Sequence, residues 1–497
     1  MTEDSIYLRM EDSIQRYGVL PKDFILEQKT IKENEIAYAP GALEGICSHH
    51  LASGGNAKDF CQLIKECLDM DPKEALLKFE AGVFGEVQIA TIRKELLQEI
   101  YENRQEYHAG ALKRLGATFV TCGQKIISVK LGLCLLNLFD LSENEGAKRI
   151  LKVLAHSEEF TDYVIWNVVS WEEKEAQDFY FEMAQKLTGW GKINVVEAMK
   201  ADTREKKEWL LCHGCKNSVL YAYLGYECAM KSDMYQRLQA GNFSDEEFAG
   251  ASDIMSGLLD EGPCQGISAL EEPVDFACLY LEECRKHNWD AEQVALITDI
   301  ASYFKTSEIE NAQVVVERAK DVLERLDMNA FIVENMENSM HNCMRIAQMY
   351  EIDMAEHLLR LMKMDFEKYY KFCSYFFEKE KYVDEFIDLC DRKIDYTKFQ
   401  TGMGNALGLG VIQGDIRLDM IVQYLHRCYH KGTKMIQICI QSPITRWRNV
   451  AAKAMQGWVT SSGKSLADID AGLYGEVKRV YEVECNEQTK KMWKELL

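Results

Sequence analysis

The stretch Ser142-Glu-Asn-Glu-Gly-Ala-Lys-Arg-Ile-Leu-Lys-Val-Leu154 contains the pattern that decides the fold of this chain. Its apolar residues are spaced i, i+3, i+4, i+7, at Ala147, Ile150, Leu151 and Leu154, which places them on one face of a helix. Ser142 and Glu145 have the spacing of a capping box, which predicts the start of that helix. A helix this short cannot bury its apolar face alone, but a stack of such helices can. The stretch therefore predicts an array of short, packed helices.

The same pattern continues over the whole segment from Lys130 to Lys231. Further helix starts are predicted at Ser170–Glu173 and Asp202–Glu205, with a turn at Gly189-Trp-Gly191. Outside the segment, start signals of the same type are Asp71-Pro72-Lys73-Glu74, Ser244–Glu247 and Asp290–Gln293. No run of β-branched residues alternates cleanly between apolar and polar positions, so no sheet is expected. The sequence predicts an all-α fold.

The C-terminal part of the chain suggests which kind of array to expect. Ser442-Pro443, Arg448-Asn449 and the small-residue helix that ends at Trp458 resemble one repeat of the HEAT-like type. Helical units recur every few dozen residues, but without a fixed period. We therefore expect an irregular HEAT-like helical-repeat solenoid.

Glycine and proline divide the chain into four predicted segments. Residues 1–58 are irregular and are predicted to be an N-terminal cap, because terminal repeats are usually atypical. Residues 59–249 are predicted to form a first helical array and residues 274–497 a second one. Residues 250–273 lie between them and are predicted to be a linker or long loop, since they contain four glycines and two prolines.

Composition limits the location and the partners of the protein. The 497 residues carry a formal net charge of −22, which disfavours nucleic acid and anionic membrane surfaces as partners. The longest apolar run, around residues 131–141, is shorter than the roughly 18 residues of a membrane span, so none is expected. The N-terminal residues lack the pattern of a signal peptide, and the seventeen cysteines have no repeated spacing. We expect a cytoplasmic protein with free thiols.

One glycine-rich loop is a candidate cofactor site. Gly402, Gly404 and Gly408 resemble the loop in which glycines let the backbone approach the pyrophosphate of a dinucleotide. That site also needs a buried strand directly before the loop, and residues 395–400 are too polar and too short for one. The alternative is a flexible turn between helices.

Two further pairs of residues have the spacing of chemical sites. Cys212 and Cys215 have the Cys-x-x-Cys spacing of redox motifs, but the flanking sequence is helical, so a helix junction is the alternative. His426 and His430 are spaced i, i+4 and could share a metal, but Arg427 stands where metalloproteases have glutamate. Paired surface histidines are the alternative, and no metal site is predicted.

The signatures of other oxidative cofactors are absent from the sequence. No histidine follows an acidic residue by three positions, as a di-iron bundle requires, and neither the haem-thiolate loop nor a flavin signature occurs. Residues 369–386 contain eight aromatic side chains. They could line an apolar ligand cavity, or they could form packed helix core.

The chain as a whole resembles the bacterial proteins that carry the name limonene hydroxylase. The resemblance covers most of the chain, and its motifs are Lys130-Leu-Gly-Leu133, Glu158-Glu-Phe-Thr161, Gly189-Trp-Gly-Lys-Ile193, Glu208-Trp-Leu-Leu211, Gly214-Cys-Lys-Asn217 and Arg448-Asn449. It implies hydroxylation of the monoterpene limonene to carveol and perillyl alcohol, and further oxidation of those alcohols with NAD or NADP. The partner implied is an apolar small molecule. The resemblance brings no catalytic residue with it, so the catalytic residues are unknown.

Two hypotheses about function follow. The resemblance implies a monoterpene-oxidising enzyme, with Gly402, Gly404 and Gly408 as the only candidate contact for the nicotinamide cofactor. The residues themselves suggest a non-catalytic helical-repeat scaffold that binds a protein partner on its concave face.

Overall fold

The computed structural model describes residues 5–28, 34, 38–50, 57–82, 89–262, 264–378, 380–408, 412 and 414–497. These residues form two compact units, which follow one another along the chain at Leu326 and Asp327. Asn34 belongs with the second unit. Each unit is described by itself.

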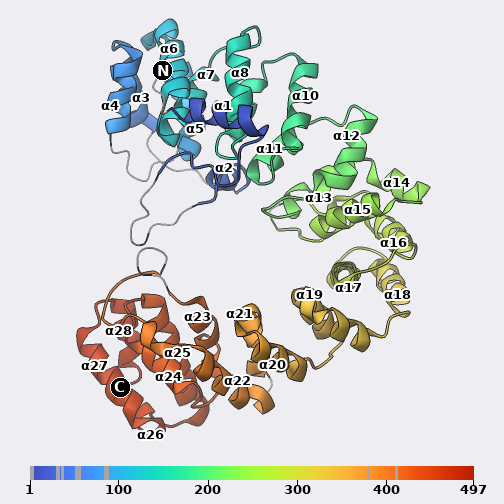
Figure 1. Ribbon diagram of the computed structural model, residues 1–497, viewed down its shortest axis with the longest axis vertical. Helices are drawn as coiled ribbons and strands as arrows, with labels where there is room; N and C mark the ends of the chain where they lie inside the picture. The colour runs from blue at the N-terminus through green and yellow to red at the C-terminus, as the bar shows by residue number, and fades with distance from the viewer. Residues whose placement is uncertain are drawn as a thin grey trace. The chain divides into compact units, whose positions relative to one another are not determined.

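The first unit is built of short helices (Figure 1). Its helices are α1 (Ile6–Tyr17), α2 (Ala42–His49), α3 (Ala57–Leu68), α4 (Pro72–Ala81), α5 (Ile89–Glu102), η1 (Arg104–Glu106), α6 (Ala109–Cys122), α7 (Ile126–Leu136), α8 (Glu145–Leu154), α9 (Thr161–Val168), α10 (Glu173–Ala184), α11 (Trp190–Ala198), α12 (Arg204–Trp209), the π-helix η2 (Leu210–Gly214), α13 (Ala222–Lys231), α14 (Met234–Ala240), α15 (Asp245–Leu258), η3 (Ile267–Ala269), α16 (Pro273–Cys284), α17 (Ala291–Thr306) and α18 (Ala312–Leu323).

The second unit is also helical. It contains α19 (Met328–Met349), α20 (Ala355–Met364), α21 (Phe366–Tyr369), η4 (Tyr370–Glu378), α22 (Glu380–Lys393), η5 (Tyr396–Lys398), α23 (Ile416–Val422), η6 (Leu425–Arg427), α24 (Thr433–Ile440), α25 (Thr445–Ser462), α26 (Leu466–Ile469), α27 (Ala471–Val483) and α28 (Glu487–Lys494). The described part of the chain contains no strand, and its isolated β-bridge joins Ala406 to Ile444. The predicted all-α class is confirmed. The HEAT-like type of repeat stays a prediction.

Several helices begin where the sequence predicts. Asp71 caps α4 with Pro72 in its first turn, and Ser244 and Asp290 form capping boxes at the starts of α15 and α17. The predicted boxes at Ser142 and Ser170 are wrong. The caps there are the side chains of Asn144 and Glu172, which lie two residues further on and accept hydrogen bonds from the first turns of α8 and α10.

Residues 250–258, the first part of the predicted linker or long loop, lie in α15, whereas residues 259–262 and 264–272 form a loop that contains the short helix η3. The chain divides between its two units at Leu326. The glycines in α15 permit close packing: a Cβ atom on Gly250 would lie 2.1 Å from the Leu211 carbonyl oxygen, and one on Gly257 would lie 2.6 Å from that of Tyr221. Gly250 and Gly257 therefore permit close contacts between helices, whereas the sequence alone suggested that they belong to a loop.

The odd-numbered helices from α5 to α17 form one continuous layer of the first unit. Each of them packs against the next, from α5 against α7 to α15 against α17. Neighbouring helices outside this series pack on it, such as α6 on α7, α10 on α11 and α18 on α17. The N-terminal helix α1 packs against α6 and α8, so it belongs to the body of the unit. Contacts between near neighbours in sequence are typical of stacked helical units.

A fully buried ion pair holds the C-terminal part of the second unit. Arg448 in α25 donates two hydrogen bonds of 2.8 Å to Glu484, and both side chains have zero exposure. Arg448 also donates to the carbonyl oxygens of Ser442 and Gly404, while Glu484 accepts from the indole of Trp493 at 3.1 Å. A single ion pair therefore connects α25, α28 and two loops. The predicted apolar stripe of α25, from Ala451 to Trp458, is buried beside it.

We predict that Arg448→Ala destabilises the second unit by about 3–5 kcal/mol, because it leaves the Glu484 carboxylate buried without a counter-charge. Arg446 is the matched control, since it lies on the same helix and its ion pair with Asp419 is largely exposed. Arg446→Ala should cost less than about 1 kcal/mol. Hydrogen exchange of α25 and α28 measures both changes. Equal protection in the two variants would contradict the assigned role of Arg448.

Candidate functional site

The predicted cofactor loop lies between η5 and α23 and packs against the turn before α25. The amide of Gly402 donates to the Gln441 carbonyl oxygen at 2.9 Å, and the Gly404 carbonyl oxygen accepts from Arg448 at 2.8 Å. Gly402 and Gly408 have positive φ angles of 128° and 82°, which glycine adopts at little cost. The residues before the loop form a short 3-10 helix where a dinucleotide site has a strand. Cofactor binding at this loop stays a prediction.

Cys212 lies in the middle of the π-helix η2, and Cys215 follows its last residue. The Lys192 ammonium group donates to the carbonyl oxygens of His213 and Lys216, at 2.8 Å and 2.6 Å, and so joins α11 to this helix end. Burial, together with the negative charge of nearby glutamates, raises the pKa of Cys212 to about 11. Burial also raises the pKa of Cys215 well above its ordinary value. A redox pair needs a stabilised thiolate. The raised pKa values of both cysteines disfavour the thiolate, so they favour the interpretation of this motif as a helix junction.

His426 and His430 do not lie on one helix face. The short helix η6 ends at Arg427, and His430 has a positive φ angle of 54°. His430 contacts Asp470 at 3.0 Å, whereas His426 contacts the Gln423 carbonyl oxygen at 2.8 Å. Within the described ranges, no cluster of three or more His, Cys, Asp or Glu residues is arranged to hold a metal ion.

The aromatic residues of segment 369–386 contact one another. Phe376 stacks on Phe386 with ring centres 4.8 Å apart, and Phe377 stacks on Tyr424 at 5.5 Å. Phe376 and Phe386 have zero exposure. These contacts are those of packed helix core.

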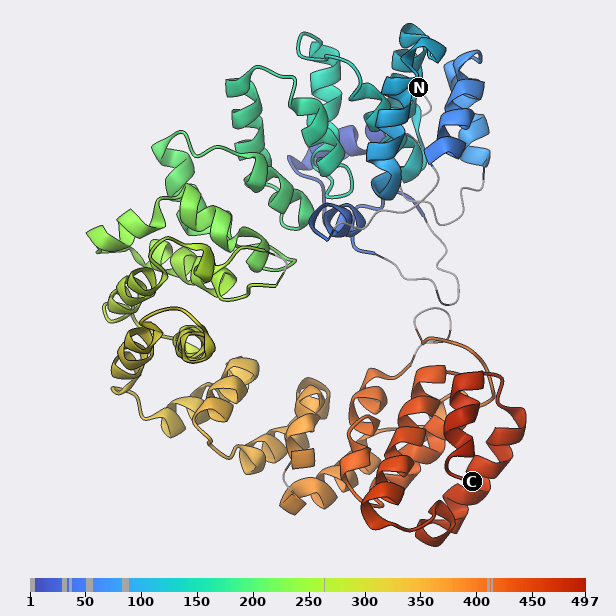
Figure 2. The same ribbon diagram turned by 180° about the vertical axis from the view of Figure 1, so that it is seen from behind.

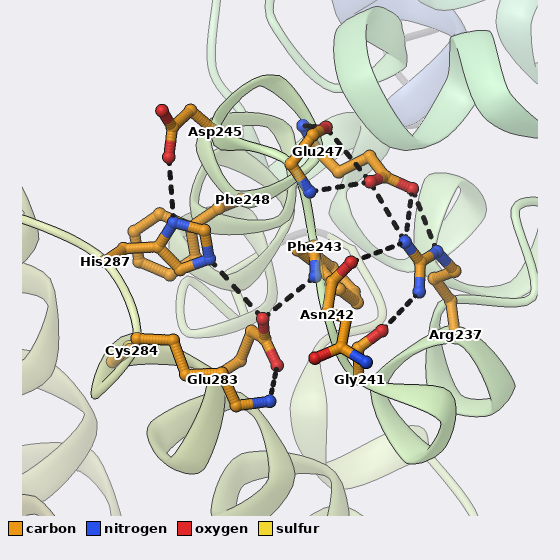
Figure 3. Close-up of polar contacts among 12 residues, drawn as sticks. Arg237, Gly241, Asn242, Phe243, Asp245, Glu247, Phe248, Glu283, Cys284 and His287 are labelled. Carbon is orange, nitrogen blue, oxygen red and sulfur yellow. Dashed lines mark hydrogen bonds and ion pairs between the residues drawn. The ribbon is translucent and has the colours of Figure 1, made fainter.

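A polar cluster surrounds the junction between α14 and α15 (Figure 3). Arg237 donates to the carbonyl oxygen of Gly241 at 2.7 Å and pairs with both carboxylate oxygens of Glu247. On the other side of the junction, Glu283 from α16 accepts a hydrogen bond from the Phe243 amide at 2.9 Å. The two charged side chains hold the short loop from both sides.

His287 completes this cluster. Its ring stacks on Phe248 with centres 4.2 Å apart, and its two nitrogens contact Asp245 at 3.0 Å and Glu283 at 3.4 Å. A general base needs an unoccupied nitrogen that faces its substrate. Both nitrogens of His287 are engaged by carboxylates, so the ring joins α15 to the end of α16.

A pocket of about 350 Å³ lies between α8 and α10. It is lined by Lys152, Glu172, Lys174, Glu175, Asp178, Phe179 and Glu182. An apolar substrate such as a monoterpene requires a mainly apolar lining. This charged pocket does not provide one.

Four of the motifs that carry the family resemblance, those that begin at Lys130, Glu158, Gly189 and Gly214, contact one another in the first unit. Glu158 accepts from the amides of Gly189 and Gly191 and so caps the start of α11. Lys130 in α7 pairs with Glu159, and Lys192 in α11 reaches the end of η2. Lys130, Glu158 and Lys192 thus supply charges that join one helix to the next.

Helix α2 lies on this same layer, and both views of the ribbon place it beside α11 (Figures 1 and 2). Its Glu44 carboxylate is 3% exposed and accepts from the Lys130 ammonium group at 2.6 Å and from the Tyr163 hydroxyl at 3.0 Å. At the start of α2, the Gly41 amide donates to Glu159 at 2.9 Å. The residues that receive α2 come from successive helices and are here called the α2-binding face: Lys130, Glu159, Tyr163, Trp190, Glu197 and Tyr223.

The end of α2 enters an aromatic box. The ring of His49 lies 5.5 Å from that of Trp190 and 5.0 Å from that of Tyr223, and its Nε2 contacts Glu197 at 2.9 Å. Burial lowers the pKa of His49, but the hydrogen bond and ion pair with Glu197 outweigh burial and raise the pKa overall. The box therefore favours a positive charge at this position.

The charges around the Glu44 carboxylate, whose surroundings are here called the first pocket, also support one another. Burial lowers the pKa of Lys130, but Glu44 and Glu159 outweigh burial and raise the pKa overall. Burial and the Glu44 carboxylate raise the pKa of Tyr163 well above its ordinary value. At neutral pH the pocket thus presents a cation and a hydroxyl donor to a carboxylate.

Sequence reasoning missed most of the α2-binding face. Glu44 and Lys130 are 86 residues apart, and Tyr163 and Tyr223 resemble ordinary core residues in the sequence. One signal was present: Lys130 stands at the start of the longest apolar run of the chain, where an unpaired charge is costly.

No protein-family model, no curated protein and no solved structure matches this chain. Among the described residues, no helix combines the length and the apolar character that crossing a membrane requires. None of the seventeen cysteines forms a disulfide bond in the structure, in which all of them are described.

We predict that Cys212 reacts slowly with iodoacetamide in the folded chain at pH 7, because a thiol with a pKa near 11 is thiolate in only about one molecule in 10,000. Its rate should rise about tenfold per pH unit up to pH 10. Cys485 is exposed and serves as the reference thiol. Mass spectrometry of the alkylated sites measures both rates. A Cys212 rate equal to that of Cys485 at pH 7 would favour thiol chemistry at Cys212.

Proposed function

We propose that this protein is a helical scaffold that binds a helix of a protein partner on the α2-binding face. The observation that carries the proposal is the docking of α2, a short helix from the N-terminal part of the chain, across α5, α7, α9, α11 and α13. A row of stacked helices presents an extended surface of this kind, and proteins recognise helices by laying them along such surfaces.

The way in which α2 is held resembles a reversible interface more than a core. Its apolar residues Leu43 and Ile46 remain half-buried, while the buried positions are Gly41, Glu44 and Gly45. The buried positions of α2 and its N-cap are therefore two glycines and one carboxylate, with no large apolar side chain among them. Interfaces within a chain that are small and polar behave like transient protein interfaces.

The α2 contact is also incompletely satisfied. The Oε2 atom of Glu44 is buried without a hydrogen-bond partner among the described residues. An unpaired buried acceptor costs about 1–3 kcal/mol. A helix that satisfied this position better would bind the face more tightly than α2 does.

The scaffold proposal is tested with Gly45→Leu in the full chain. A Cβ atom on Gly45 would lie 2.0 Å from the Trp190 ring, so a leucine side chain should release α2 from the face. Faster hydrogen exchange of residues 42–49 would report this release. A fluorescent peptide of residues 38–50 should then bind the variant at least about tenfold more tightly than the unaltered chain, in which α2 competes at an effective concentration of about 1 mM.

Gly475→Leu is the matched control for this experiment. Gly475 lies in α27, and a Cβ atom there would contact nothing within 4 Å. This variant should bind the peptide as weakly as the unaltered chain does. If the Gly45→Leu chain is folded but binds no peptide at about 1 mM, the scaffold proposal for this face fails.

Monoterpene oxidation, which the resemblance implies, stays a prediction. It requires the chain to bind a nicotinamide cofactor, with Gly402, Gly404 and Gly408 as the candidate contacts. Titration with oxidised and reduced NAD and NADP tests it directly: binding that Gly404→Leu abolishes would support the enzyme hypothesis, since a side chain there blocks backbone approach. No binding by any of these cofactors at millimolar concentration would contradict the assignment of this loop.

A further inference from the structure

We infer that the α2-binding face selects a partner helix by charge, requiring a carboxylate at one position and a cation five residues later, and that α2 occupies the face as an internal competitor of that helix. The inference rests on the proposed scaffold function and specifies its partner. The two positions are those of Glu44 and His49 in α2.

The first pocket is built to receive a carboxylate. Lys130 and Tyr163 are 4% and 1% exposed, and both donate to the same oxygen of Glu44. Lys130 is also paired with Glu159, which belongs to the layer itself. When Glu44 leaves, Lys130 keeps a counter-charge. The pocket can therefore exchange one carboxylate for another without leaving a buried charge alone.

The second pocket is built to receive a cation. Trp190 and Tyr223 lie with ring centres 4.8 Å apart and both contact the His49 ring, and Glu197 supplies a carboxylate to its Nε2. The face of an aromatic ring attracts positive charge, and a neighbouring carboxylate adds to that attraction. Lysine or arginine of a partner helix meets the same requirements as a protonated histidine.

Two glycines set how closely a helix can approach. Gly45 lies against the Trp190 ring, and a Cβ atom on Gly41 would lie 2.4 Å from the Glu158 carbonyl oxygen. The partner helix is thus expected to carry small residues three positions before and one position after its carboxylate. Together with the two charges, these positions define a pattern that few helices fulfil.

The occupancy by α2 leaves room for competition. Glu44 Oε2 is unpaired, and Leu43 and Ile46 are only half-buried. A partner helix with the same charges that also satisfied the second carboxylate oxygen, or buried more apolar surface, would displace α2. Displacement exposes α2, so binding of the partner and release of α2 are one event.

A peptide series tests the charge pattern on the full Gly45→Leu chain. Each peptide spans residues 38–50, and its affinity is measured by fluorescence anisotropy. Glu44→Gln should weaken binding about tenfold or more, because it removes the charge that Lys130 receives. His49→Ala should weaken binding about threefold to tenfold, whereas His49→Lys should retain it.

The decisive control is a peptide that combines Glu44→His with His49→Glu. It has the same composition and net charge as the natural peptide but presents each charge to the wrong pocket. We expect its binding to be lost. Affinity within about twofold of the natural peptide, for this control or for either weakening substitution, overturns the inference while the scaffold function stands. If the natural peptide itself does not bind, the scaffold proposal fails first.

Discussion

The buried ammonium group of Lys130 is the charge on which the candidate site depends. A buried charge is stable only when it is paired and hydrogen-bonded, and Lys130 is paired with Glu159 of its own layer and with Glu44 of α2. One side chain therefore joins α7 to the start of α9 and holds α2 against both. Because Glu159 also pairs with Lys130, the ammonium group keeps one counter-charge when α2 leaves. The proposal that α2 is a docked helix rests on this asymmetry.

The same constraint recurs at other buried cations of the chain. Lys192 is satisfied by two carbonyl oxygens at the end of η2, and Arg448 by Glu484 and two loop carbonyl oxygens. These residues lie in motifs that carry the resemblance to limonene hydroxylases. In both motifs the charged side chain connects separate elements of the chain. Monoterpene oxidation, which the resemblance implies, stays a prediction.

The helical class and many helix starts could be predicted because they depend on local chemistry, such as the caps at Asp71, Ser244 and Asp290. The glycines of α15 could not be distinguished from loop glycines, since a close helix contact such as that of Gly257 with Tyr221 involves residues distant in sequence. The candidate site was missed for the same reason. Lys130 signalled that a buried charge was present, but nothing near it in the sequence indicated Glu44. The predicted glycine loop could be located, but its hydrogen bonds with Gln441 and Arg448 could not.

The central claim is that α2 is held on a stable layer and leaves it independently. Hydrogen exchange of the unaltered chain, resolved by helix, tests this claim most directly, because local opening and global unfolding give different protection. The account predicts that the amides of α2 exchange faster than those of α7, α9 and α11, while these three helices remain protected. If α2 is as protected as they are and exchanges only when the whole unit unfolds, then α2 is an integral part of the core and the account is wrong.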